Sequence, residues 1–394
     1  MSIFSEAQAL HDKLTGYRRF FHENAEVSLD MPVGSAYVKK CLLEMGYEPS
    51  DCGSNGVTAI AGGKKEGKTF LLRADMDALP IIEESDLDFK SKTHNMHACG
   101  HDFHAAMLLG AAKILKDRED DICGKVKLMF QPGEETMEGA LSMMDAGVMD
   151  NPAVDAALMI HVMSGSDFPS GAVLFSTSPL ASSDWFEITV KGKGCHGAMT
   201  DEGVDPLNIL SHIFLALQTL NSREVGPTKS MSLTIGQMSG GTSGNIIPDT
   251  AYMIGTLRTF SEKLRAFAKT RIAEIAKGVA LTFRGDVDVT FFRGCPTLDN
   301  NKALNKQILK YTQGLFDEGV VLDRGGKAVL GMGSEDFAFI AKRVPSILVA
   351  LSAGSAKEGY SYPMHHPKAA FNESVLPAGA AIYANSALRW LEEN

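Results

Sequence analysis

Two short polar segments hold the residue types with which metal hydrolases work. Residues 95–104 read NMHACGHDFH, and residues 131–135 read QPGEE. Together they supply a thiol, several imidazoles and two adjacent carboxylates, a donor set that suits a site for two metal ions. Both segments lie close to the ends of predicted strands, where α/β folds build their sites. The donor types therefore favour a two-metal hydrolase.

In the first segment, Cys99 and His101 flank Gly100, so one tight turn can direct both side chains at a metal ion. A buried cysteine by itself is more often a small hydrophobic residue. His97 and Asp102 add two further polar groups within six residues, and burying all of these without a purpose would be costly. The grouping favours Cys99 and His101 as ligands.

The second segment ends a predicted strand with the pair Glu134 and Glu135. Adjacent carboxylates are common on surface turns, but beside a metal cluster one can bind metal while the other acts as general base. His161 ends the apolar run AALMI, a position where a lone histidine is more often a core residue. His365 and His366 lie in the late loop YPMHHP, and either could close the site.

The bulk composition narrows the class of protein. A net charge of −10 over 394 residues argues against attraction to nucleic acid or to anionic membranes. The sequence has no apolar run of about eighteen residues and no visible secretory signal. Its six cysteines lack paired spacing, so we expect reduced thiols and a cytoplasmic protein.

The hydrophobic patterns predict a catalytic domain that an inserted domain interrupts. Helices are expected at 5–23, 32–45, 104–116 and 302–315, and strands at 57–61, 69–76, 125–131, 153–162 and 346–352. This alternation is typical of an α/β sheet with helices on its faces. In the intervening residues 182–294, the predicted order is strand, helix, strand, strand, helix and strand, which is the ferredoxin-like split order. The expected domains are 1–181 and 295–394 for the catalytic part and 182–294 for the insertion.

Two matches to nucleotide-binding motifs are rejected on their context. GGKKEGKT at Gly62–Thr69 fits the phosphate-loop pattern, but FLLRA after it continues as a strand where a helix is needed. We interpret it as a polar hairpin turn between two strands. GKGCHG at Gly192–Gly197 fits a dinucleotide pattern, but Gly203 and Pro206 delay any helix. Neither motif supports an ATPase or a dehydrogenase.

Several longer stretches make the sequence resemble one family. Four stretches resemble the signature of one group of enzymes: RADMDALP at 73–80, HACGHD at 97–102, QPGEE at 131–135 and HHPKAAFNE at 365–373. This signature is that of the metal-dependent amidohydrolases of peptidase family M20, subfamily D. This group contains hippurate hydrolases, N-acyl-amino-acid amidohydrolases and indole-acetyl-amino-acid hydrolases. The stretches that resemble its lid domain are GKGCHGAMTDEGVDP at 192–206, GGTSGNIIPD at 240–249 and GTLRTF at 255–260. The resemblance covers nearly the whole chain in order.

The resemblance implies a metallopeptidase-like α/β catalytic domain with an inserted ferredoxin-like α+β lid and dimerisation domain. It implies two divalent metal ions per subunit, zinc or manganese, with cobalt or nickel as alternatives. The implied ligands are Cys99, His101, Glu135, His161 and His365. Glu134 is implied as the general base, and His196 as a histidine that a partner subunit inserts to stabilise the oxyanion. Asn245 and Arg258 are implied to hold the substrate, Arg258 by pairing with an α-carboxylate.

The resemblance also concerns several positions outside the implied set of ligands and catalytic residues. Asp77 is expected to orient a ligand. Gly133 stands where many relatives carry alanine, and His366 occupies a position that the family varies, so the resemblance favours His365. The stretch MGSEDFAF also resembles the family, but a Ser334 N-cap followed by acids in the first helical turn explains it. We therefore leave residues 334–336 out of the expected site.

The expected activity is hydrolysis of the amide bond of an N-acyl amino acid, a small molecule, by a homodimer or tetramer. Glu134 would take the proton of the attacking water and deliver it to the leaving amine. A deacetylase, or a dipeptidase or carboxypeptidase-like hydrolase of the same fold, remains an alternative. A catalytically silent dimeric binding protein is a further one, although the presence of a base and five ligands argues against it.

Overall fold

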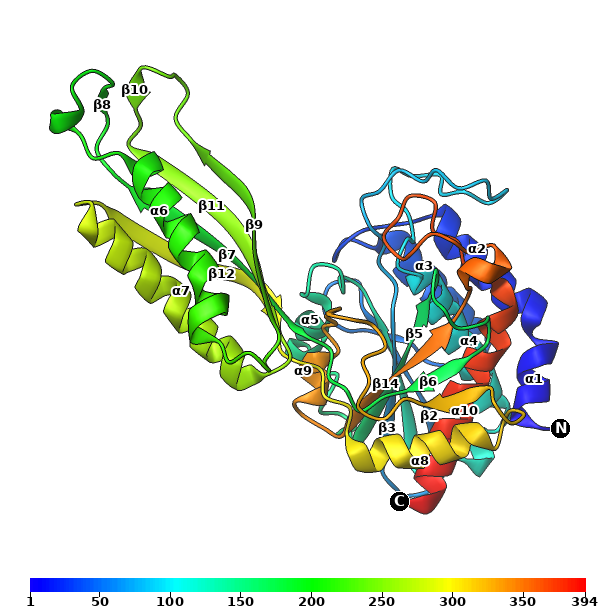
Figure 1. Cartoon of the computed structure of the whole chain (residues 1–394). Coiled ribbons are helices and arrows are strands. Elements are labelled where there is room, and N and C mark those ends of the chain that lie inside the picture. The colour runs from blue at the N-terminus through cyan, green and yellow to red at the C-terminus, as the bar shows by residue number, and fades with distance from the viewer. The chain divides into compact units, whose positions relative to one another are not determined.

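The computed structural model describes all 394 residues, and the chain divides into two compact units (Figure 1). Unit 1 comprises Met1–Pro179, Asp299–Val329 and Asp336–Asn394. Unit 2 comprises Leu180–Leu298 and the short segment Leu330–Glu335. None of the helices is both long and apolar enough to cross a membrane.

Unit 1 is built on an eight-stranded sheet in the order β1-β2-β4-β3-β5-β14-β6-β13. Its strands are β1 (Ser50–Asp51), β2 (Val57–Gly62), β3 (Thr69–Asp75), β4 (Lys125–Gln131), β5 (Ala156–Met163), β6 (Val173–Phe175), β13 (Val321–Asp323) and β14 (Ser346–Ser352). The neighbours β4, β3, β5 and β14 run parallel to one another. β3, β5 and β14 are buried along their whole length, as expected for strands with helices on both faces. The carboxyl ends of these strands lie on one edge of the sheet, where such folds place their sites.

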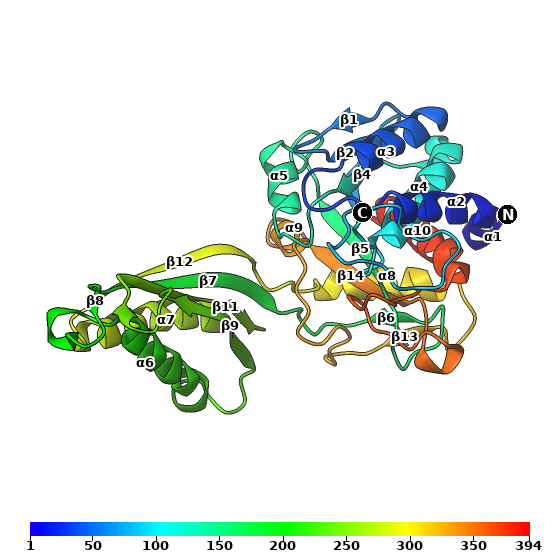
Figure 2. The same cartoon turned by 90° about the horizontal axis from the view of Figure 1, so that it is seen from above.

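Helices cover this sheet (Figure 2). They are α1 (Ile3–Ala9), α2 (His11–Glu23), α3 (Pro32–Glu44), α4 (His101–Asp117), α5 (Gly139–Asp145), α8 (Lys302–Gln313), α9 (Ala338–Ala341) and α10 (Leu376–Glu393), with single turns at Glu119–Asp121, Ala356–Glu358 and Glu373–Val375. α4 and α10 are buried along most of their length and pack closely. A Cβ on Gly379 of α10 would lie 1.9 Å from the sulfur of Met107 in α4, so this close contact needs glycine.

Unit 2 contains a four-stranded antiparallel sheet in the order β12-β7-β11-β9. Its elements are β7 (Ser182–Lys191), α6 (Pro206–Thr219), β9 (Met231–Gly240), β11 (Thr250–Thr259), α7 (Glu262–Thr282) and β12 (Asp286–Cys295), with the small pair β8 (Cys195–His196) and β10 (Ile246–Ile247) and the turns Thr200–Glu202 and Leu220–Glu224. Burial alternates along β11, and the buried residues of β7, β11, α6 and α7 form one hydrophobic core. The order of elements is the ferredoxin-like split pattern.

The structure confirms the mixed α/β fold and most of the expected elements, and it corrects two local predictions. The helix predicted at 5–23 is two helices, because Leu10 (φ −91°, ψ 1°) leaves the helical conformation between α1 and α2. The apolar periodicity runs through that break, so no sequence signal marked it. The loop Gly62–Thr69 is not a hairpin turn, since β4 lies between β2 and β3 in the sheet. A strand still follows this loop, as expected.

Candidate metal centre and active site

A glycine-dependent turn brings Cys99 and His101 together. Gly100 has φ +87° in the left-handed region and is the N-cap of α4, and a Cβ there would lie 2.4 Å from a methyl group of Val162. Only glycine meets both demands without strain. Cys99 and His101 leave this turn buried, and they share a donor cluster with His161, in which the three ligand atoms lie within 4.8 Å of one another.

Hydrogen bonds decide which histidines can bind metal. His161, on β5, has Nδ1 2.7 Å from the carbonyl oxygen of Val162, which can only accept, so the ring proton lies on Nδ1. The lone pair of Nε2 is then available, and Nε2 lies 3.7 Å from the sulfur of Cys99. In His104, Nε2 accepts the backbone N–H of Val162 and Nδ1 donates to Asp75. Both nitrogens of His104 are thus engaged, which gives it a structural role.

The late loop contributes His365. Its Nε2 lies 3.2 Å from the sulfur of Cys99 and 3.5 Å from Oε1 of Glu135. The residue has φ +66°, which is unusual for a residue other than glycine, and its backbone N–H donates to the carbonyl of Ala98. A strained backbone position beside polar donors is typical of functional sites.

The neighbouring His366 is directed elsewhere. Its Nδ1 accepts the backbone N–H of Lys368, and its ring stacks on Tyr362 with centroids 4.4 Å apart. The geometry therefore brings His365, and not His366, to the donor cluster.

Asp77 organises the glutamate pair and a candidate ligand at once. Its two oxygens accept the backbone N–H groups of Glu134 and Glu135 at 3.0 and 3.1 Å. The ring nitrogen Nδ1 of His101 lies 3.3 Å from the same carboxylate. Because a carboxylate only accepts, Nδ1 of His101 carries the proton and Nε2 points into the cluster.

The donor atoms fit a pair of divalent cations. Nε2 of His101 and Oε1 of Glu135 are buried, make no hydrogen bond and lie 4.0 Å apart. Leaving two such groups unpaired is costly unless a bound cation uses them. Cys99, Glu135 and His365 form a second donor group, and His101, Glu134 and Glu135 a third. The mixture of thiol, imidazole and carboxylate suits transition metals better than calcium or magnesium.

Burial dominates the protonation of the cluster. It raises the pKa of the Cys99 thiol to about 12, with the charge of Glu135 adding to the effect. It raises the pKa of Glu135 to about 7, although the positive charge of His101 acts against the shift. It also holds the pKa of His161 well below the ordinary value. Since metal ligands must be deprotonated, binding of a cation here should release protons.

Unit 2 holds the three remaining predicted residues at two separate places. β8 pairs with β10 so that His196 lies opposite Ile246, and Asn245 immediately precedes that strand. Nδ1 of His196 accepts the backbone N–H of Ala198, which leaves the proton of the neutral ring on Nε2. The two residues are therefore neighbours, and both are exposed.

Arg258 lies towards the other end of β11. It donates to the carbonyl of Met332 and to the hydroxyl of Ser334 at 3.1 and 3.0 Å. Eight residues of strand separate Thr250, near β10, from Arg258, a distance of about 27 Å at about 3.4 Å per residue. The structure thus groups His196 with Asn245 and separates Arg258 from them.

The role expected for residues 334–336 is wrong. α9 begins only at Ala338 with Phe337 as its N-cap, and Ser334 instead accepts the hydrogen bond from Arg258. Asp336 is fully buried and forms a 2.8 Å ion pair with Arg73. A serine followed by acids is the usual signature of a helix start, so the sequence could not reveal a partner 263 residues away.

A second buried charge cluster was also missed. Asp102, next to His101, lies 2.7 Å from Nε of Arg18 and 2.8 Å from Nδ1 of His22. His97 is buried beside it outside the donor groups, and burial lowers its pKa to about 3. Composition around residues 97–104 indicated a polar cluster, but only the fold brings in α2.

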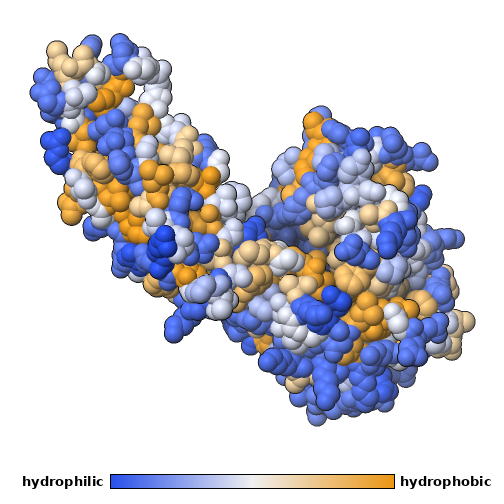
Figure 3. Space-filling model, in the orientation of Figure 1, coloured by the Kyte–Doolittle hydropathy of each residue, from blue (hydrophilic) through white to orange (hydrophobic).

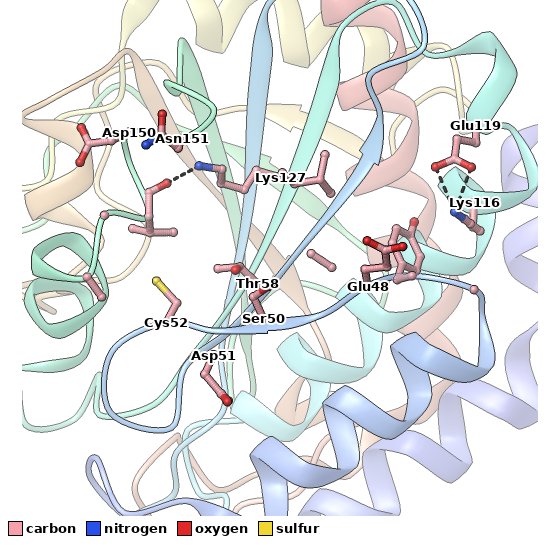
Figure 4. Close-up of a pocket in the computed structure, with 17 residues that line it drawn as sticks. Glu48, Ser50, Asp51, Cys52, Thr58, Lys116, Glu119, Lys127, Asp150 and Asn151 are labelled. Atoms are coloured by element: carbon pink, nitrogen blue, oxygen red, sulfur yellow. Dashed lines mark hydrogen bonds and ion pairs between the residues drawn. The ribbon is translucent and has the colours of Figure 1, made fainter.

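A cavity of about 630 Å³ lies away from these residues (Figure 4). It is lined by residues of β1, β2 and β4 and of the loop after α5. Lys127 is buried in its wall and donates to the carbonyls of Val148 and Pro152, which explains why this lysine is there. None of the candidate ligands lines the cavity, so the cavity is not part of the candidate metal centre.

Known proteins share both the sequence and the fold. The model of peptidase family M20/M25/M40 matches residues 71–389. N-acetyl-L-cysteine deacetylase of Bacillus subtilis is 35% identical over 98% of this chain and 90% of its own length. Thermostable carboxypeptidase 2 of Saccharolobus solfataricus is 36% identical over 98% of this chain and 97% of its own length. The crystal structure of the YXEP protein of Bacillus subtilis, described as a dinuclear metal binding peptidase from the M20 family, superposes with a TM-score of 0.81 at 30% identity, covering 98% of this chain and 99% of that one. The chain belongs to peptidase family M20/M25/M40.

Proposed function

We propose that this protein is a metal-dependent amidohydrolase that cleaves N-acyl amino acids into a carboxylic acid and the free amino acid. The observation that carries the proposal is the buried cluster of thiol, imidazole and carboxylate donors with a second carboxylate, Glu134, beside it. Full-length similarity to a deacetylase of N-acetyl-L-cysteine supports the substrate class.

The proposed ligands are Cys99, His101, Glu135, His161 and His365. The two divalent cations that they would hold, zinc or manganese, supply Lewis-acid polarisation of the acyl carbonyl and a more acidic attacking water.

Glu134 acts as the general base in this proposal. Its side chain is buried, its backbone N–H is fixed by Asp77, and its Oε1 accepts the backbone N–H of Asp336 at 3.3 Å. A carboxylate held in this way can take the proton of the attacking water and deliver it to the leaving amine. Asp77 keeps Glu134 and His101 in register, because its carboxylate contacts both.

Unit 2 would complete the site as a lid and dimerisation domain. Arg258 would bind the α-carboxylate of the substrate, while His196 and Asn245 would serve the site of a partner subunit, with His196 stabilising the oxyanion. The distance of about 27 Å along β11 supports this division of labour between two sites.

A homodimer is supported by the surface of unit 2. Unit 2 makes up less than a third of the chain but carries nine of the sixteen exposed large hydrophobic side chains. Figure 3 shows hydrophobic residues along this unit. Exposed apolar surface of this kind marks interaction sites.

The six cysteines are all free, which fits the reducing cytoplasm.

Cleavage of peptides at their carboxyl end is the second candidate, supported by the similarity to a carboxypeptidase. Both activities would use the same base and ligands. A panel of N-acetyl, N-benzoyl and N-indolylacetyl amino acids, tested beside dipeptides of the same amino acids, separates them by kcat/KM.

Glu134→Gln and Glu135→Gln are a matched pair for testing the proposed roles. Glu134→Gln should keep its metal and lose about 10²-fold or more in kcat, the usual scale for a positioned proton-transfer group. Glu135→Gln should lower the metal content that elemental analysis measures. Exchanged phenotypes would show that base and ligand are assigned the wrong way round, and full activity of both variants would refute the site.

A further inference from the structure

The carboxylate of Asp336 accepts hydrogen bonds from three donor groups. Oδ1 accepts from Nη2 of Arg73 at 2.8 Å, and both oxygens accept from Nε2 of Gln131 at 2.8 and 2.9 Å. Oδ2 also accepts the backbone N–H of Ala140 at 2.9 Å. The side chain is fully buried, so no water competes for these bonds. Charge-assisted bonds of this kind fix the orientation of the carboxylate.

The same residue contacts the proposed general base through its main chain. The backbone N–H of Asp336 donates to Oε1 of Glu134 at 3.3 Å. Because the side chain of Asp336 is anchored, the direction of this N–H is fixed as well. The backbone N–H of Glu134 is bound to Asp77, so Glu134 is held at its main chain and at its carboxylate.

Arg73 connects this arrangement to the metal ligands. Its Nε donates to Oε1 of Gln131 at 2.9 Å, and its Nη1 pairs with Asp75 at 2.8 Å. Asp75 in turn lies 3.7 Å from Nε2 of His101. One guanidinium thus lies between a carboxylate behind the base and a carboxylate behind a ligand, and both pairs are fully buried.

Stability alone does not account for such a cluster. Buried ion pairs are often no more stabilising than well-packed apolar residues of similar volume, because desolvation offsets the attraction between the charges. What an apolar replacement could not provide is a fixed N–H aimed at Glu134. Misplacement of a reacting group by about 1 Å can cost about 10²-fold in rate.

We propose that Asp336 is a positioning residue for Glu134, with Arg73 and Gln131 as its anchors. This inference rests on the proposed function, in which Glu134 is the base. Asp336 does not contact the substrate; its carboxylate locks the main-chain N–H that orients the carboxylate of Glu134.

The test is Asp336→Asn in the metal-loaded enzyme, with an N-acyl amino acid that the wild type hydrolyses. An amide keeps only one accepting oxygen and cannot accept from all three donor groups, so we expect kcat to fall roughly tenfold or more while KM and the metal content stay unchanged. Asp184→Asn is the matched control, since Asp184 is a buried carboxylate held by Arg265 and Lys269 in unit 2, and it should leave kcat unchanged.

A double-mutant cycle separates positioning from general damage. In the Glu134→Gln background the base is already absent, so adding Asp336→Asn should lower the residual kcat no further. An equal loss in both backgrounds, or a kcat of Asp336→Asn close to that of the wild type, would overturn the inference. Arg73→Lys, which keeps the charge but loses the planar fork, gives the same cycle if Asp336→Asn does not fold. Absence of wild-type turnover would refute the proposed function itself, and this inference with it.

Discussion

Replacing Glu83 by glutamine should make the protein less stable at neutral pH and remove part of its sensitivity to acid. Glu83 lies in the loop after β3, and its side chain is only 4% exposed. Its Oε1 lies 3.2 Å from Nε2 of His22 and also accepts the hydroxyl of Ser85, and its Oε2 accepts the backbone N–H of Ser91 at 2.8 Å. The adjacent backbone N–H of Glu84 donates to Pro367, so this loop also supports the segment that carries His365.

The magnitude follows from the pKa of Glu83. Burial is the largest single effect and opposes its ionisation, but the hydrogen bond and charge of His22 together with the hydrogen bonds from Ser85 and Ser91 outweigh burial and lower the pKa from 4.5 to about 2. A carboxylate with a lower pKa in the folded state stabilises the fold above its unfolded pKa and loses that contribution as the pH falls. The shift corresponds to about 3 kcal/mol at pH 7 and less than half of that at pH 3, and most of it is lost between pH 4.5 and 2.

Urea denaturation of wild type and Glu83→Gln at pH 7, 5, 4 and 3 measures this contribution. The difference in unfolding free energy should be largest at pH 7 and shrink towards pH 3. Glu84→Gln is the control, because Glu84 is the exposed neighbour, and its difference should be small at every pH. A Glu83→Gln difference that stays constant from pH 7 to pH 3 would refute the electrostatic reasoning and assign the effect to packing.

The remaining predictions concern the metal site and the dimer. Chelation should abolish activity and a divalent metal should restore it, while Cys99→Ala should lose bound metal by elemental analysis; full metal and full activity in Cys99→Ala would exclude it as a ligand. Mixing Glu134→Gln with His196→Ala protomers under exchange should restore roughly a quarter of wild-type activity, because random pairing gives heterodimers with one complete site. No recovery after confirmed exchange would show that His196 acts within its own subunit.

Much of the fold could be predicted from local sequence signals. β4 and β14 begin and end at the predicted residues, because apolar runs bounded by turn residues define buried strands well. The delay of any helix until Pro206 is confirmed as well, since α6 begins at Pro206 with Asp205 as its N-cap. Strand order was not readable: the hairpin expected between β2 and β3 failed because β4, which pairs with both, lies more than fifty residues further along the chain.

The donor types of the site were also written in the sequence, since thiol, imidazole and carboxylate groups stand out at the ends of apolar strands. Tertiary structure decided which of them meet. His104 lies in the histidine-rich segment, but both of its ring nitrogens are hydrogen-bonded, to Asp75 and to Val162. His365, by contrast, contacts Cys99 although the two residues are 266 positions apart in the sequence. Asp336 resembles a helix start and proves to be the buried partner of Arg73. A sequence fixes the chemistry of each side chain and its local geometry, but the direction of a hydrogen bond depends on groups that only the folded chain brings within reach.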